Sequence, residues 1–148
     1  MPKFAADRML ARLARWLRLL GADVLFDPSL EGHKLLGQAR AEGRITLTRD
    51  KRLRTAPDAL YLEDNLFRDQ LRAVLARFPF DPRRGAFTRC SHCNERLIDA
   101  GRDTVARRVP PFVYASQQRF TRCPRCGRVY WGATHPERIR RELQSMGL

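Results

Sequence analysis

The chain has 148 residues, of which 43% are hydrophobic and 30% are charged, so it can bury one core and still carry a small appended module. No apolar stretch approaches the ~18 residues that a membrane span needs, which excludes a helical membrane protein. The formal net charge of +13 rests almost entirely on arginine, because the sequence holds only three lysines. Arginine contacts phosphate through a planar, bidentate group, so the charge favours a nucleic-acid partner, with a solubilising surface as the alternative.

The first half of the chain alternates between short apolar runs and helical patterns. In chain order we expect a strand at 4–6, a helix at 8–20, a strand at 24–26, a helix at 32–42, strands at 45–47 and 59–62, and a helix at 66–78. Gly21 and Gly43 mark the ends of the first two helices. Because strands joined through helices pair in parallel, the pattern predicts an α/β fold, a parallel sheet flanked by helices.

A segment at 79–85, rich in proline and arginine, separates this half from a stretch with a different sequence pattern. After it the predicted elements are short, all four cysteines appear, and the next long amphipathic helix begins near Pro136. We therefore expect two domains, an α/β domain at 1–85 and a cysteine module with a carboxy-terminal helix at 86–148. The amino terminus lacks the apolar core of a signal peptide, so we expect a cytoplasmic protein.

The cysteines form two C-x-x-C turns, which contain Cys90, Cys93, Cys123 and Cys126. Each turn directs two thiolates to one point, and two turns supply a closed tetrahedral site for a structural Zn²⁺. A disulfide or a redox C-x-x-C would leave one turn unexplained, and cysteines of the cytoplasm bind metal more often than they pair. His92 and His135 are alternative ligands, but four cysteines already fill the shell. The spacing therefore predicts a small zinc ribbon.

Arginines and aromatic residues are interleaved in the loops of this module, and Arg122 and Arg125 are candidate RNA contacts. Arginines bind phosphates and aromatic rings stack on unpaired bases, so the combination favours single-stranded RNA or DNA. The alternative is that the aromatic side chains form the small core of the ribbon. Phe120 and Trp131 are the strongest candidates for such a core.

An aspartate follows each of the four predicted strands, at Asp7, Asp27, Asp50 and Asp64. In a parallel sheet these positions share the carboxyl edge, where α/β sheets bind ligands. Carboxylates gathered there repel one another unless a cation lies among them, and oxygen ligands select Mg²⁺ or Mn²⁺. Two metals in a carboxylate cluster are a standard arrangement for cutting a phosphodiester. Taken singly, each aspartate is also explained as a turn residue or a helix cap.

The predicted helix at 8–20 carries a basic stripe beside Asp7. Arg8, Arg12 and Arg15 lie about one turn apart opposite the leucines, with Arg18 nearby. A phosphate backbone bound at the carboxyl edge would lie along this stripe, and a solvated basic face is the alternative. We include Arg49, next to Asp50, among the candidate RNA contacts.

Four segments, taken in order, resemble a known family. They are FAADRMLARLARWLRLLGADVLFDP, ARAEGRITLTRDKRL, RCSHCNERL and RCPRCGRVYWGATH. Together they resemble the Mut-seven carboxy-terminal ribonuclease-like family over nearly the whole chain. The resemblance implies a PIN-like nuclease domain with a zinc ribbon fused behind it. It also implies a metal-dependent ribonuclease that uses Mg²⁺ or Mn²⁺.

The acidic positions of the family carry over to Asp7, in the DRML motif, and to Asp50, in the TRD motif. Related PIN-like sequences usually carry an acid at the start of the second helix, where this chain has Gly32. Glu31, one residue earlier, is the candidate substitute, and a metal shell with fewer carboxylates is the alternative. Asp64 is the candidate for the fourth carboxylate, with its neighbour Glu63 as the alternative.

Two functions are consistent with these patterns. The first is a ribonuclease in which Asp7 and Asp50 hold Mg²⁺ or Mn²⁺ and Glu31 and Asp64 assist. The arginines and the ribbon position single-stranded RNA. The second is a non-catalytic adaptor that binds RNA or the ribosome and has a decayed active site. Gly32 at an expected acidic position and the strong positive charge motivate the second hypothesis.

Overall fold

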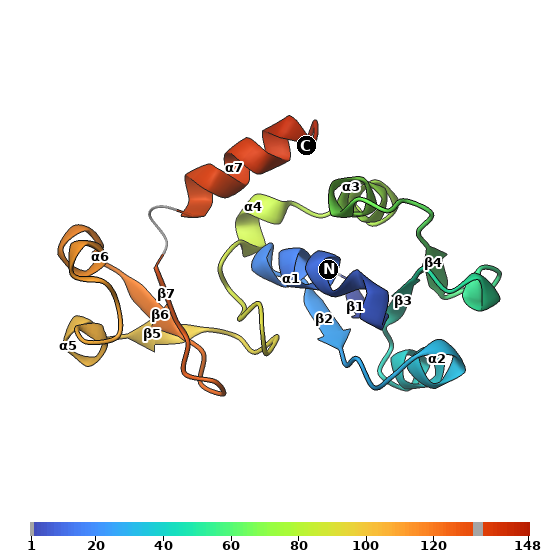
Figure 1. The fold of residues 1–148 in the computed structure, drawn as a ribbon, viewed down its shortest axis with the longest axis horizontal. Helices are drawn as coiled ribbons and strands as arrows, with labels where there is room; N and C mark the ends of the chain where they lie inside the picture. Colours follow the sequence, from blue (N-terminus) through green and yellow to red (C-terminus); the bar gives the residue numbers. More distant parts are fainter. Residues whose placement is uncertain (1, 132–134) are drawn as a thin grey trace.

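The first half of the chain forms a four-stranded parallel sheet. A computed structural model describes residues 2–131 and 135–148, and Figure 1 traces the chain through them. The sheet order is β2-β1-β3-β4, with strands β1 (Lys3–Ala6), β2 (Asp23–Phe26), β3 (Ile45–Thr48) and β4 (Ala59–Tyr61). All the pairings are parallel, and Phe4 lies opposite both Val24 and Ile45. The predicted parallel α/β sheet is confirmed.

Helices cover both faces of this sheet. The three predicted helices are present as α1 (Ala11–Leu19), α2 (Gly32–Ala41) and α3 (Phe67–Arg77). Successive residues of a strand point to opposite faces, and β1 is buried on both. Phe4 and Ala6 pack into the main core with α1 and α3. Ala5 packs on the other face against Leu35 and Ala39 of α2, which explains why residues 4–6 of β1 are all apolar.

The first helix begins later than the sequence predicts, because Asp7 caps a tighter turn. A 3₁₀ turn, η1 (Arg8–Leu10), precedes α1. The Asp7 carboxylate accepts a hydrogen bond from the backbone N–H of Met9 at 2.8 Å, which satisfies one of the donors that every helix start leaves open. The end of β1 and the start of the helix are thus joined through one side chain.

Two glycines bring the segment at 79–85 against the end of α1. Gly21 has a φ of +99°, and a Cβ atom at this position would lie 2.4 Å from the carbonyl oxygen of Gly85. A side chain at Gly21 would therefore be excluded twice, by the left-handed backbone and by the neighbouring chain. The segment that the sequence predicts as a linker contains a short helix, α4 (Pro82–Gly85).

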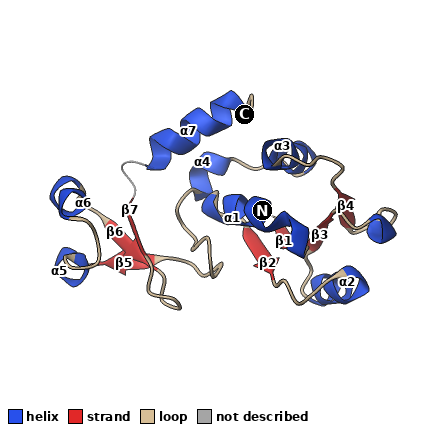
Figure 2. Cartoon of the chain, viewed as in Figure 1, coloured by secondary structure: helices blue, strands red, loops and turns tan. Residues whose placement is uncertain are grey.

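The cysteine module contains a second sheet, of three antiparallel strands. In the order β5-β6-β7 these are β5 (Ile98–Ala100), β6 (Phe120–Arg122) and β7 (Val129–Trp131). Two short helices, α5 (Arg102–Val105) and α6 (Pro111–Ser116), lie between β5 and β6. Figure 2 shows these short strands apart from the parallel sheet. Phe120 is buried in the core of the module and Trp131 packs against it, so both aromatic residues serve the ribbon core.

The carboxy-terminal helix α7 (His135–Ser145) returns to the first half of the chain (Figure 1). Its residues Ile139 and Leu143 are buried in the main core, as is Met146 just after it. Arg72 of α3 donates two hydrogen bonds to the Met146 carbonyl, the shorter at 2.7 Å. The helix expected to belong with 86–148 therefore packs on the α/β core, while a boundary near residue 85 stays a prediction. Within the described residues, no helix is long and apolar enough to cross a membrane.

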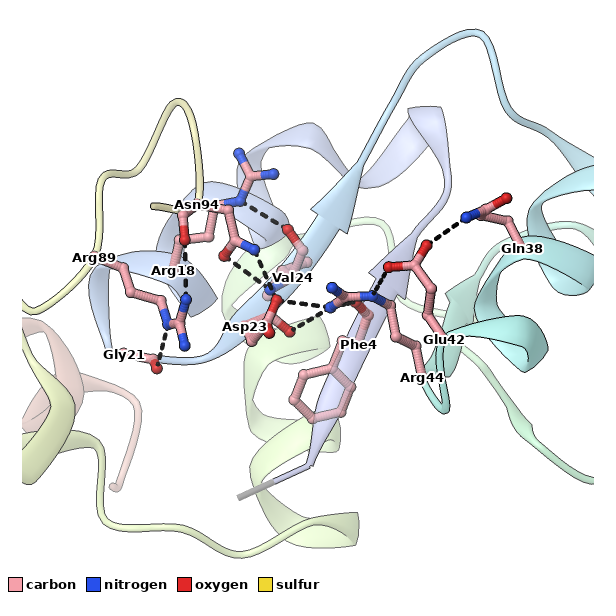
Figure 3. A network of polar contacts seen from close by, with 10 residues as sticks. All are labelled: Phe4, Arg18, Gly21, Asp23, Val24, Gln38, Glu42, Arg44, Arg89 and Asn94. Carbon is pink, nitrogen blue, oxygen red and sulfur yellow. Dashed lines mark hydrogen bonds and ion pairs between the residues drawn. The ribbon is translucent and has the colours of Figure 1, made fainter. Parts of the chain in front are cut away.

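Asn94 fastens the first cysteine turn to the edge strand β2 (Figure 3). The Asn94 side-chain oxygen accepts a hydrogen bond from the Val24 N–H at 3.0 Å, and its amide donates to Asp23 at 2.7 Å. An edge strand presents polar backbone groups without a strand partner, and Asn94 pairs one of them. Asn94 has a φ of +68°, a left-handed conformation that Asn adopts more readily than most residues.

Arg18 makes the second connection between α1, β2 and the cysteine turn. Its side chain donates to the Val24 carbonyl at 2.9 Å and to the carbonyls of Ser91 and His92 at 3.2 and 3.0 Å. Arg18 is buried, with only 5% of its surface exposed. Arg18, which the sequence places near the basic stripe, therefore adds nothing to an exposed basic face, because its guanidinium donates to backbone carbonyls inside the protein.

An ion pair supports the same junction from the side of the sheet. Arg44 contacts Asp23 at 2.7 Å and also donates to the Phe4 carbonyl at 3.2 Å (Figure 3). Burial raises the pKa of Asp23, but the hydrogen bonds from Arg44 and Asn94 outweigh it and leave the pKa below its usual value. Asp23 therefore remains a carboxylate at neutral pH and holds Asn94 in place.

We expect replacement of Arg18 by Met to lower the free energy of unfolding by about 2–3 kcal/mol, because three carbonyl groups lose a charged donor. Urea unfolding followed by circular dichroism measures this change. The matched control is Arg15→Met on the same helix, whose exposed side chain should change the stability by no more than ~0.5 kcal/mol. Equal stability of the two variants would contradict the structural role of Arg18.

Candidate active site

A pocket of about 420 Å³ opens at the carboxyl edge of the parallel sheet. Three of the four predicted carboxylates line it: Asp7, Glu31 and Asp50. Its cationic lining residues are Arg8, Arg49, Lys51 and Arg52. The topology explains this gathering, since Asp7 follows β1 and Asp50 follows the neighbouring strand β3. Acidic and basic groups therefore share one concave surface, which suits a ligand that carries both a phosphate and a cation.

Asp7 is the most tightly held of these carboxylates. It is 5% exposed, and its two oxygens accept three hydrogen bonds, each 2.8 Å long. The donors are the Met9 N–H, the Thr48 hydroxyl and the Arg49 N–H. These bonds fix the orientation of the carboxylate at the floor of the pocket.

Thr48 joins Asp7 to Asp50. Its hydroxyl donates to Asp7 and accepts a hydrogen bond from the Asp50 N–H at 2.9 Å, and the residue is fully buried. Sequence reasoning missed Thr48, although the signal was present: a hydroxyl residue at the end of an apolar strand, two positions before an aspartate. In a buried position such a hydroxyl needs a partner, and at a sheet edge that partner lies on the adjacent strand.

Asp50 is paired within its own turn. The carboxylate accepts hydrogen bonds from the Arg52 backbone at 3.0 Å and from the Arg52 guanidinium, the shortest at 2.8 Å. The side-chain hydrogen bond from Arg52, followed by the one from its backbone, lowers the pKa of Asp50. The guanidinium is well exposed, whereas the carboxylate is only 21% exposed. Arg52 thus acts as an exposed counterion for a carboxylate that stays ionised below its usual pH range.

The Arg52 guanidinium also fills the space beside Gly32. A Cβ atom at Gly32 would lie 3.0 Å from a guanidinium nitrogen of Arg52 and 3.7 Å from an oxygen of Asp50. Gly32 has a φ of +56°, which disfavours a side chain independently of the available space. An acid at this position would point at Asp50, and here Arg52 stands in that place. The absence of a side chain at Gly32 therefore leaves room for the Arg52 guanidinium beside Asp50.

The remaining predicted acids have contacts of their own. Glu31 makes an ion pair with Arg8 at 3.3 Å and is more than half exposed. Asp64 is exposed and is not among the pocket residues, although its backbone carbonyl accepts a hydrogen bond from Gln70 at 2.8 Å. Asp27 binds its own turn through Ser29. The structure thus brings together Asp7, Asp50 and Glu31 but not Asp64.

The donor chemistry of this pocket fits Mg²⁺ or Mn²⁺, because its acidic groups offer oxygen ligands. Each of the three carboxylates already accepts a hydrogen bond or an ion pair from the protein. In the described part of the chain, the group of three or more ligand atoms within 4.8 Å of one another is the cysteine cluster. Two of the carboxylates, Asp50 and Glu31, are paired with the exposed side chains of Arg52 and Arg8.

The predicted RNA contacts have different surroundings. Arg15 is exposed on α1, Arg12 lies 3.9 Å from the ring centre of Phe67, and Arg125 pairs with Glu95 at 3.9 Å. Arg122 is half-buried on β6. Their contacts with RNA stay predictions.

Arg49 holds the loop after β4. Its guanidinium donates to the Leu62 carbonyl at 3.2 Å, to the Glu63 carbonyl at 2.9 Å and to the Asp64 carbonyl. It also donates to the Asn65 side chain at 2.7 Å. Arg49 therefore stabilises the loop after β4, and a contact with a phosphate of RNA would be a second role for this residue.

The second chemical centre is the cluster of Cys90, Cys93, Cys123 and Cys126, whose sulfur atoms all lie within 4.8 Å of one another. None of the four forms a disulfide. The Cys123 sulfur accepts hydrogen bonds from the backbone of Arg125 and Cys126 at 3.4 Å. The four thiols suit a closed tetrahedral metal site, and the predicted zinc ribbon agrees with this geometry. His92 is not part of the cluster, and the side chain of His135 lies outside the described residues.

One of three comparisons with known proteins finds a match. The family model of the Mut7-C RNAse domain matches residues 2–143, which is nearly the whole chain. No curated protein and no solved structure matches the chain. The match confirms the resemblance drawn from the four sequence segments, and the family name indicates a ribonuclease-like function. The chain therefore belongs to the Mut7-C RNAse domain family.

Proposed function

We propose that this protein is a metal-dependent ribonuclease that hydrolyses phosphodiester bonds in single-stranded RNA. The pair of aspartates that Thr48 joins at the carboxyl edge carries the proposal. Asp7 and Asp50 line one pocket with arginines, which is the charge pattern that a phosphate and its counterion require. The family match supports the ribonuclease class, and the oxygen donors support Mg²⁺ or Mn²⁺.

Asp7 and Asp50 would hold the divalent cation, with Glu31 in reach once it leaves Arg8. The cation would activate a water molecule and stabilise the negative charge that develops on the phosphate. The fixed orientation of Asp7 limits the reorganisation needed during the reaction, since three hydrogen bonds already set its position. Arg8 and Arg52 would turn from their carboxylate partners to the phosphate, because both side chains are more than half exposed.

The cysteine module would support this reaction as a structural zinc ribbon. Its first turn is attached to β2 through Asn94 and Arg18, so the zinc would stabilise the outer edge strand of the parallel sheet. Arg122 and Arg125 extend the basic surface of the module and would contact the RNA backbone. The free thiols also favour a reducing, cytoplasmic location.

A second function is supported by one observation, the replacement of an expected acid by Gly32 with Arg52 beside it. With Arg52 paired to Asp50, the pocket carries a built-in cation and fewer open carboxylates. In that case the protein would bind RNA or the ribosome without cutting RNA. Metal binding separates the two functions, because a decayed site would not take up Mn²⁺.

We expect Asp7→Asn and Asp50→Asn each to lower Mn²⁺-dependent cleavage of a labelled single-stranded RNA by about 100-fold or more, since metal charge stabilisation supplies several kcal/mol. Asp27→Asn is the matched control, because Asp27 follows a strand of the same sheet but binds only its own turn. Its cleavage rate should equal that of the unmodified protein. Cleavage that persists in both Asp7→Asn and Asp50→Asn would rule out this active site.

We expect Arg52→Ala to bind Mn²⁺ about two- to fivefold more tightly, because Arg52 and the cation compete for the Asp50 carboxylate. Isothermal titration calorimetry with Mn²⁺ measures the affinity. Arg54→Ala is the control, since Arg54 is exposed nearby but pairs with Glu63 instead. An unchanged affinity in Arg52→Ala would show that Arg52 is no competitor of the metal.

We expect Cys123→Ser to lose bound zinc and to weaken RNA binding, while the Mn²⁺ affinity of the carboxylate pocket survives. A structural zinc site depends on all four thiolates, whereas Asp7 and Asp50 take their hydrogen bonds from the α/β half of the chain. Zinc content by atomic absorption and Mn²⁺ titration test the two parts. Loss of Mn²⁺ binding together with zinc would instead show that the ribbon holds the carboxylate pocket in shape.

A further inference from the structure

A second groove, of about 470 Å³, opens beside the carboxylate pocket. We call it the base groove and define it by Met9, Arg12, Asn65, Leu66 and Phe67, which are among its lining residues. It lies between the start of the first helix and the start of α3. The proposed reaction makes no use of this groove, so its composition needs a separate explanation.

The base groove adjoins the carboxylate pocket. Met9 lines both, and its backbone N–H donates to the Asp7 carboxylate at 2.8 Å. On the other side, Arg49 of the carboxylate pocket donates to the Asn65 side chain at 2.7 Å. A ligand bound at Asp7 would therefore extend into the groove past Met9 and Asn65.

Two apolar side chains stand exposed at the groove. Met9 and Leu66 each have 67% of their surface exposed. Among the described residues four large hydrophobic side chains are exposed, and the other two, Ile98 and Phe112, belong to the cysteine module. Paired exposed apolar groups inside a concave surface indicate a binding site more strongly than scattered ones do.

A stack of flat groups lies beside them. The Arg12 guanidinium lies 3.9 Å from the ring centre of Phe67, and Trp16 stacks on Phe67 with ring centres 5.5 Å apart and an angle of 28°. Arg12 is exposed to solvent, so a further flat group can add to the stack. Aromatic rings and arginine planes are the surfaces on which proteins stack unpaired nucleobases.

We propose that the base groove holds one nucleobase of single-stranded RNA, from a nucleotide next to the scissile phosphate. The inference rests on the proposed action on RNA. The described lining residues of the groove include the cationic Arg12 and Arg68 and no carboxylate. The positive charge suits the phosphate of a nucleotide, and the apolar side chains suit its base. The Asn65 amide nitrogen would bind an edge of the base, because the Asn65 oxygen already accepts from Arg49. Arg12 is thus a base contact rather than a phosphate contact.

The test measures binding of the zinc-loaded full chain to two labelled strands without added Mg²⁺ or Mn²⁺. One strand is a short single-stranded RNA, and the other is an abasic strand of equal length and charge. Fluorescence anisotropy should show that the protein binds the RNA about tenfold more tightly, the effect expected of a stacked base. In Met9→Ala/Leu66→Ala this preference should shrink about tenfold, while binding of the abasic strand stays unchanged.

Two further variants keep the test decisive. Arg12→Lys retains the charge but not the flat guanidinium, so it should lose the preference for bases and keep the affinity for the abasic strand. Phe112→Ala, which removes an exposed apolar side chain of α6, should retain the preference. Equal binding of the two strands by the unmodified protein overturns the proposal, as does a preference that survives in Arg12→Lys and Met9→Ala/Leu66→Ala. Either result would indicate that the exposed apolar groove binds a protein partner instead of a nucleobase.

The outcome is separable from that of the ribonuclease proposal. Cleavage is measured with Mn²⁺ in a second assay, where Asp7→Asn should abolish cutting but retain the preference for bases. If the protein prefers the strand with bases but never cuts RNA, the ribonuclease proposal is overturned and the proposed base-binding role of the groove stands. Cleavage of RNA by a protein that binds both strands equally would support the ribonuclease proposal and overturn the proposed base-binding groove.

Discussion

The hydrogen bonds of Asp7 are the constraint on which the carboxylate pocket depends. The side chain takes one donor from the turn that follows β1 and two from the end of β3, the Thr48 hydroxyl and the Arg49 N–H. It therefore starts the first helix, joins two neighbouring strands and forms the floor of the pocket. A buried carboxylate with three donors is costly to move, since its departure leaves polar groups unpaired. Asp50 is then placed relative to Asp7 by the shared hydroxyl of Thr48.

The strong positive charge is divided among arginines with different tasks. Arg18 and Arg44 are taken up inside the fold, where they bind backbone carbonyls and Asp23. Arg52 neutralises Asp50 at the pocket, and Arg12 lies on an aromatic ring. Net charge alone therefore overstates the surface that phosphate can reach. Arg8 is an exposed arginine that lines the carboxylate pocket, which is where the proposed substrate would bind.

The two halves of the chain are joined at the outer edge of the parallel sheet. Val24 of β2 is paired on its free side by Asn94 and Arg18, so the first cysteine turn closes an edge that would otherwise be open. Helix α7 strengthens the connection by burying Leu143 in the α/β core. A zinc ribbon in this position supports the sheet and enlarges the basic surface, while the proposed chemistry belongs to Asp7 and Asp50.

The strands and helices of the first half, the parallel sheet and the cysteine turns were all predictable from the sequence, because hydrophobic periodicity and ligand spacing are local properties. The sequence also brought Asp7 and Asp50 to one edge, since parallel strands share a direction. The tertiary structure alone decided that Thr48 joins them, that Arg52 fills the space beside Gly32 and that Arg18 is buried. Such contacts depend on which side chains meet through the folded backbone, and no local pattern encodes that meeting.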